Sequence, residues 1–105
     1  METSHKLTVV NPFTLQPFAT TYQAGPEELE YAITKAERVR QELKKLPVFK
    51  RYEILMQIAT EIKSKREQLA TVLCQESAKP MRYALGEIDR AGQTFIIAAE
   101  ECKRL

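Results

Sequence analysis

The chain has 105 residues, so it forms at most one domain with a small hydrophobic core. Hydrophobic residues make up 44% and charged residues 29% of the chain, which is typical of globular proteins and excludes a disordered one. Its 16 basic and 14 acidic residues are interleaved, as on solvated helix faces, and this argues against nucleic-acid binding. No apolar run approaches the roughly 20 residues of a membrane span.

The first residues divide into a polar leader and a β-rich region. Residues 1–6 lack the apolar core of a signal peptide, so we expect a disordered leader on a cytoplasmic protein, followed by a folded part over residues 7–105. Two β-rich runs, Leu7 to Val10 and Phe18 to Gln23, flank a turn that begins at Asn11-Pro12. The pattern predicts a β-hairpin.

A first helix is predicted after the hairpin. Gly25-Pro26-Glu27-Glu28 is typical of a helix start, because proline presets φ and the two carboxylates face the positive end of the helix dipole. Pro47 ends the helical pattern. Apolar residues recur at helical spacing between these limits and form one stripe: Leu29, Ile33, Ala36, Val39 and Leu43.

Three more helical segments follow. One begins near Val48, and the polar run from Lys63 to Arg66 predicts a kink near Ser64 before the pattern resumes to about Glu76. Pro80 can open the next helix. The residues that this last helix is expected to bury are Ala84, Ile88, Ala91, Phe95, Ala98 and Cys102. The predicted fold class is therefore α+β and mostly α, an N-terminal β-hairpin followed by four amphipathic helical segments.

The reactive residue types form no catalytic pattern. Cys74 and Cys102 both fall near the C-terminal ends of predicted helices, where the negative end of the dipole disfavours a thiolate, so we expect buried structural thiols. The single histidine, His5, lies in the leader. The 3 glycines do not form a phosphate-binding loop. The residues alone therefore assign no catalytic and no cofactor-binding position.

Several short motifs, taken in order, resemble the start of the aldehyde dehydrogenase superfamily. They are Val10-Asn11-Pro12, Arg51-Tyr52-Glu53-Ile54-Leu55, Glu76-Ser77-Ala78-Lys79-Pro80, Glu87, and the ending Ala98-Ala99-Glu100-Glu101. Two positions depart from the family pattern, because Leu15 and Ala78 stand where the family commonly has glycine. The ending is most similar to the branch of lactaldehyde and non-phosphorylating glyceraldehyde-3-phosphate dehydrogenases.

The resemblance implies an N-terminal fragment of the α/β aldehyde dehydrogenase fold, truncated before the nucleotide-binding sheet. Such enzymes oxidise an aldehyde to a carboxylate with NAD or NADP through a cysteine thiolate, and their cysteine, glutamate, oxyanion-binding asparagine and cofactor turn all lie downstream. Gly92-Gln93-Thr94-Phe95 imitates the motif around that cysteine, but it has phenylalanine at the reactive position and falls within a helix. We therefore expect the chain alone to bind no cofactor and to be inactive.

The same resemblance implies partners and one candidate site. The partners are the rest of the enzyme's own chain, further copies in a homo-oligomer, and a small aldehyde substrate of the full-length parent. Several family members hold a monovalent cation with a backbone carbonyl and a carboxylate whose matching positions are Val10 and Glu87; the alternative is a solvated Glu87 without a ligand. A standalone helical protein-interaction module, using the same apolar stripes, is the alternative function.

Overall fold

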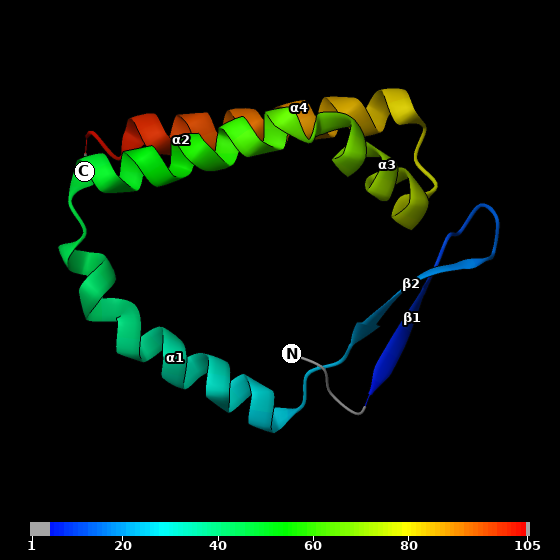
Figure 1. The fold of residues 1–105 in the computed structure, drawn as a ribbon, viewed down its shortest axis with the longest axis horizontal. Coiled ribbons are helices and arrows are strands. Elements are labelled where there is room, and N and C mark those ends of the chain that lie inside the picture. Colours follow the sequence, from blue (N-terminus) through cyan, green and yellow to red (C-terminus); the bar gives the residue numbers. More distant parts are fainter. Residues whose placement is uncertain (1–4, 105) are drawn as a thin grey trace.

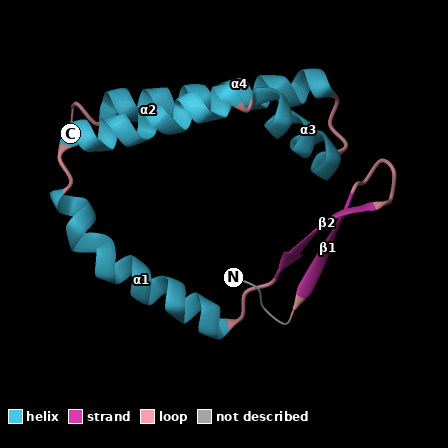
Figure 2. Ribbon diagram, viewed as in Figure 1, coloured by secondary structure: helices cyan, strands magenta, loops and turns pink. Residues whose placement is uncertain are grey.

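The computed structural model describes residues 5–104 (Figure 1). Its elements, in chain order, are the strands β1 (Lys6–Val10) and β2 (Pro17–Tyr22) and the helices α1 (Pro26–Lys45), α2 (Val48–Ser64), α3 (Arg66–Ser77) and α4 (Met81–Glu101). The predicted hairpin and four helical segments are confirmed (Figure 2). Together they form a flat, open ring that measures 47 × 38 × 17 Å.

The hairpin begins one residue earlier than predicted. Strand β1 pairs antiparallel with β2, and Lys6 lies opposite Tyr22 in this ladder. The backbone carbonyl of His5 accepts a 2.8 Å hydrogen bond from the amide of Gln23. His5 and Lys6 therefore belong to the hairpin and not to a leader, because the second strand is long enough to pair with them. Residues 1–4, the remainder of the predicted leader, lie outside the described residues.

The hairpin turn is held by hydrogen bonds to Asn11. Its side-chain oxygen accepts the amides of Phe13 at 2.9 Å and Thr14 at 3.2 Å, and its carbonyl accepts the amide of Leu15 at 2.8 Å. Leu15 has φ of 58°, in the left-handed region that favours glycine. Leu15 therefore adopts a left-handed conformation, at the position where the resemblance described above implies glycine.

Helix α1 begins and ends as predicted. The amide of Gly25 donates a 2.7 Å hydrogen bond to the carboxylate of Glu28, and the helix stops at Lys45, ahead of Pro47. None of its residues is buried. Across the described residues, α1 packs extensively against no other element, and Figure 1 shows it spanning the ring opposite α2 and α4.

Two backbone irregularities separate the remaining helices. Lys65, with φ of −101° and ψ of 17°, interrupts the α-helical backbone between α2 and α3, which confirms the predicted break. Ala78 ends α3 in a left-handed conformation with φ of 54° and ψ of 19°. Its amide donates to the carbonyl of Cys74 at 2.9 Å, so the C-cap satisfies a carbonyl of the last helical turn.

The packed core lies where α4 contacts α2 and α3. The buried side chains among the described residues are all alanines, namely Ala59, Ala70, Ala84 and Ala99. Ala99 is buried where Ala98 was predicted; these neighbours project about 100° apart on a helix, and the partner helices cover the Ala99 side. Ala84 is buried as expected, and the remaining residues expected in the α4 core are half-buried, namely Ile88, Ala91, Phe95 and Cys102. Between residues 5 and 104, no helix is both long and apolar enough to cross a bilayer.

Candidate functional site

The two thiols do not form a reactive site. Cys74 lies on α3 and Cys102 at the end of α4, and both are free. They are half-buried and not buried as predicted, because helices packed in a single layer cover each other on one side only. Gln93, in the sequence that imitates the family's cysteine motif, lies within α4 and is exposed. These positions provide no activated nucleophile.

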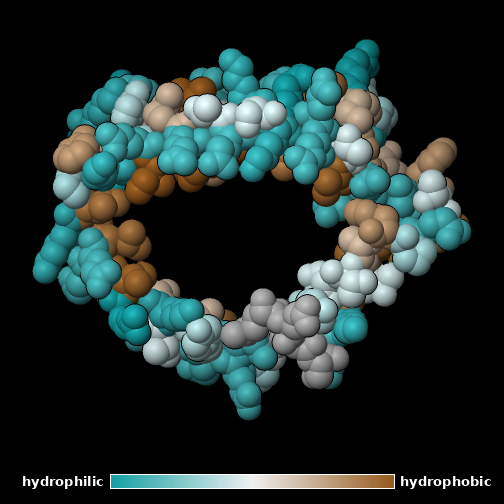
Figure 3. Space-filling view, viewed as in Figure 1, coloured by the Kyte–Doolittle hydropathy of each residue, from teal (hydrophilic) through white to brown (hydrophobic). Residues whose placement is uncertain are grey.

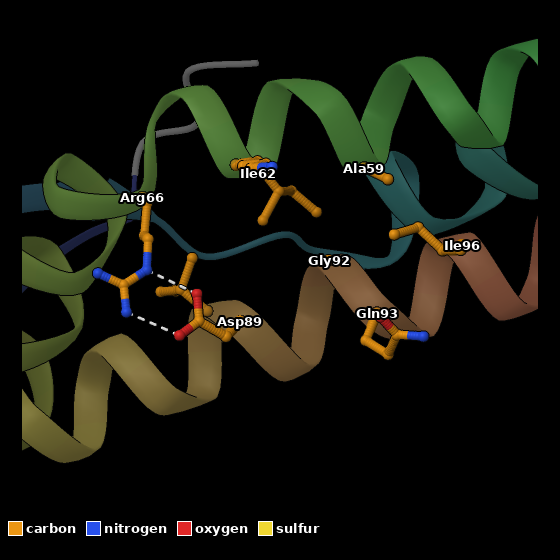
Figure 4. Close-up of a pocket in the computed structure, with 9 residues that line it drawn as sticks. Ala59, Ile62, Arg66, Asp89, Gly92, Gln93 and Ile96 are labelled. Carbon is orange, nitrogen blue, oxygen red and sulfur yellow. Dashed lines mark hydrogen bonds and ion pairs between the residues drawn. The ribbon is translucent and has the colours of Figure 1, made fainter.

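A groove lies between α2 and α4 (Figure 4). It encloses about 330 Å³ and is lined by Ala59, Ile62, Lys63, Arg66, Ile88, Asp89, Gly92, Gln93 and Ile96. A Cβ placed on Gly92 would lie 3.7 Å from Cγ2 of Ile62, an ordinary van der Waals contact, so a small residue here lets the two helices approach closely. The apolar side chains of the lining are those of Ala59, Ile62, Ile88 and Ile96.

One end of the groove is closed by an ion pair. Arg66 donates from Nε to one oxygen of Asp89 at 2.6 Å and from Nη2 to the other at 2.7 Å. This bidentate pairing lowers the pKa of the Asp89 carboxyl and raises the pKa of the guanidinium. Because both carboxylate oxygens accept hydrogen bonds, Asp89 is arranged to hold α3 against α4 and not to act as a base.

Sequence reasoning missed this pair. In the sequence, Arg66 belongs to the polar run that interrupts the apolar stripe, and no motif includes Asp89. The residues are 23 positions apart, so helical i,i+4 spacing cannot connect them. The break at Lys65 turns Arg66 toward α4, and only the packed arrangement of the helices brings the two charges together.

Glu87 lies in a second charged cluster. Its carboxylate accepts a hydrogen bond from Nζ of Lys79 and lies 3.7 Å from Nη2 of Arg90. The bond from Lys79 is the main cause of a lowered pKa of the Glu87 carboxyl. Lys79 belongs to the turn before α4, so the pair connects that turn to the helix it precedes.

Val10 and Glu87 lie on different parts of the fold. Val10 is the last residue of β1, which contacts α3, whereas Glu87 lies on α4 and is engaged by Lys79. Within residues 5–104, no cluster of 3 or more His, Cys, Asp or Glu side chains could hold a metal ion. The predicted cation site differs from such a cluster, because it combines the backbone carbonyl of Val10 with the carboxylate of Glu87. The cation site therefore stays a prediction.

Comparison with known proteins adds independent evidence. Residues 1–105 match the aldehyde dehydrogenase family. A lactaldehyde dehydrogenase of Methanocaldococcus jannaschii is 41% identical over 91 residues, which is 87% of this chain and 20% of that protein. The glyceraldehyde-3-phosphate dehydrogenase of the same organism, solved in complex with NADP, has a TM-score of 0.86 and 40% identity over 89% of this chain and 20% of its own.

A third protein extends the match over almost the whole chain. An aldehyde dehydrogenase of Physcomitrella patens, solved with the reaction product succinate, has a TM-score of 0.95 and 30% identity over 99% of this chain. The chain spans 22% of that structure, and so about a fifth of the length of the relatives it matches. With the whole sequence matched and the fold reproduced, the chain belongs to the aldehyde dehydrogenase family and corresponds to its N-terminal part.

Proposed function

We propose that this chain is the N-terminal part of an NAD(P)-dependent enzyme that oxidises a small aldehyde to a carboxylate. The observation that supports this proposal most strongly is the match to the family over residues 1–105. Identity of 41% to a lactaldehyde dehydrogenase favours a small hydroxylated aldehyde as the substrate. NADP in the solved relative favours NADP over NAD. We place the parent enzyme in the cytoplasm as a homo-oligomer.

Within such an enzyme, the chain supplies structure and not chemistry. Hydride transfer requires a cofactor held rigidly against the substrate, and the protein must provide the surface that holds it. Covalent aldehyde oxidation also requires an activated thiol beside donors for the developing oxyanion. The described residues offer two half-buried thiols at helix ends and a groove closed by a satisfied ion pair. The chain alone is therefore inactive and binds no cofactor.

Calorimetry and activity assays test this proposal directly. The isolated chain and the full-length enzyme are each titrated with NAD and NADP, and both are assayed with lactaldehyde and glyceraldehyde-3-phosphate. We expect binding and turnover from the full-length enzyme and neither from the isolated chain. A Cys74→Ser, Cys102→Ser double variant of the full-length enzyme serves as the control and should keep its activity. Cofactor binding by the isolated chain, or loss of activity in this variant, would contradict the proposal.

A standalone interaction module is the second candidate, and one observation favours it. Helix α1 has 20 residues, none of them buried, so a large apolar face is available to another molecule. As an isolated chain the protein should then self-associate or bind a hydrophobic dye. Sedimentation at increasing concentration, with dye fluorescence measured in parallel, tests this. A strictly monomeric chain that binds no dye would contradict exposed docking faces.

A further inference from the structure

Helix α3 has little apolar packing of its own. Of its 12 residues only Ala70 is buried, and the larger apolar side chains of Leu69 and Leu73 are half-buried. Its N-cap residue, Lys65, makes no capping hydrogen bond through its side chain. Isolated helices shorter than about 12–15 residues are marginal in water and depend on tertiary contacts. The stability of α3 is therefore determined by what attaches it to its neighbours.

Helix α2 provides little of this attachment. It contacts α3 far less than either helix contacts α4. Where α2 and α3 meet, a groove of about 360 Å³ is lined by residues that include Ile54, Ile58 and Leu69. Figure 3 shows hydrophobic colour along the inner rim of the ring beneath α2, so apolar side chains there face the opening. Helix α4 is therefore the main support of α3.

An ion pair attaches each end of α3 to α4. At the N-terminal end, Arg66 donates two hydrogen bonds to Asp89. Just after the C-terminal end, Lys79 donates a hydrogen bond to Glu87. The four side chains are between 32% and 55% exposed, so dissolved ions reach both pairs. Charge attractions that salt can screen therefore hold α3 at both ends.

We propose that α3 opens as one unit and that the Arg66–Asp89 and Lys79–Glu87 pairs form a salt-sensitive latch that keeps it closed on α4. Both pairs break when α3 separates from α4, so the loss of either one raises the population of the open form along the whole helix. Strand β1 contacts α3, and across the described residues no other helix packs extensively against the hairpin. Figure 1 shows α3 at the corner of the ring between the hairpin and the paired helices α2 and α4. Opening of α3 therefore also releases the hairpin from these helices.

Amide hydrogen exchange in the full-length enzyme tests the latch at two reporter amides, one at each end of α3. The amide of Leu69 donates to the carbonyl of Lys65 at 2.9 Å, and the amide of Ala78 donates to the carbonyl of Cys74 at 2.9 Å. Each amide exchanges when its hydrogen bond opens. Opening of the whole helix exposes both amides together, whereas fraying of one end exposes only the nearer one.

Two substitutions each remove one pair. We expect Asp89→Asn and Lys79→Gln each to raise the exchange rates of both reporter amides by the same factor, about three- to tenfold. Glu53→Gln is the matched control for Asp89→Asn, because Glu53 pairs with Lys50 inside α2 and the two carboxylate side chains are 57% and 55% exposed. It should leave both rates unchanged. Faster exchange only at the amide nearer the substitution, or unchanged rates at both amides, would overturn the proposal.

Salt provides a second measurement that needs no variant and so does not depend on whether a substituted enzyme folds. Raising sodium chloride from about 0.1 M to about 1 M shortens the screening length from about 10 Å to about 3 Å. Both reporter amides of the unsubstituted enzyme should then exchange faster relative to the amides of α2. Exchange at α3 that salt does not change would contradict the latch. None of these measurements uses aldehyde oxidation, so their outcome is independent of the proposed function.

Discussion

Replacing Ala78 by glycine should stabilise the protein. Ala78 ends α3 with φ of 54°, where an L-residue with a Cβ is strained by about 1–2 kcal/mol and glycine is not. Glycine also makes the unfolded chain more flexible, which offsets about 0.4–1 kcal/mol of this gain. The expected net increase in the free energy of unfolding is about 0.5–1 kcal/mol. The amide that donates to Cys74 is retained, so the cap itself is unchanged.

Urea denaturation followed by circular dichroism measures this effect. For a slope of about 1.5 kcal/mol per molar, the midpoint of Ala78→Gly should rise by about 0.3–0.7 M. Ala98→Gly is the matched control, because Ala98 is exposed within α4 and glycine should there cost about 1 kcal/mol. If both variants lower the midpoint equally, the left-handed C-cap does not strain the chain and the reasoning is wrong.

Three further predictions concern packing, acid stability and cation binding. Phe95→Ala should lower the free energy of unfolding by about 2–3 kcal/mol, less than the 3–5 kcal/mol of a fully buried ring, because Phe95 is half-buried; an unchanged urea midpoint would contradict its packing. Since Arg66 lowers the pKa of Asp89 from its usual 3.8, the pair stabilises the fold above that pH and loses its effect as the pH falls through the lowered pKa. Asp89→Asn should therefore unfold more easily than the unsubstituted protein at neutral pH and equally easily in acid, and a gap that persists in acid would refute this. If Val10 and Glu87 contribute to a cation site, potassium should raise the melting temperature of the full-length enzyme less in Glu87→Gln, whereas an identical response would rule the site out.

The local features of the fold were predictable because short-range chemistry determines them. Pro26 and Pro47 mark the limits of α1, since proline favours the first helical turn and cannot continue a helix. The polar run before Arg66 correctly indicated a break, which the structure places at Lys65. The left-handed conformation of Ala78 follows from a turn that must satisfy the last carbonyls of α3.

The tertiary features were less accessible from the sequence. Periodicity finds the apolar face of α4 but not the direction from which a partner approaches, and so it selected Ala98 where Ala99 is buried. The pairing of Arg66 with Asp89 depends on how three helices meet, which no local pattern encodes. The apolar stripe on α1 is visible in the sequence, yet nothing in its spacing indicates that it remains uncovered among the described residues.

The apolar side chains of the described residues are divided unevenly between the core and the surface. The buried residues are alanines, whereas large side chains such as Leu29 and Leu43 are more than half exposed, at 58% and 59%. Burying an alanine removes little apolar area from water, so most of the hydrophobic stabilisation available to this sequence is not realised within the described residues.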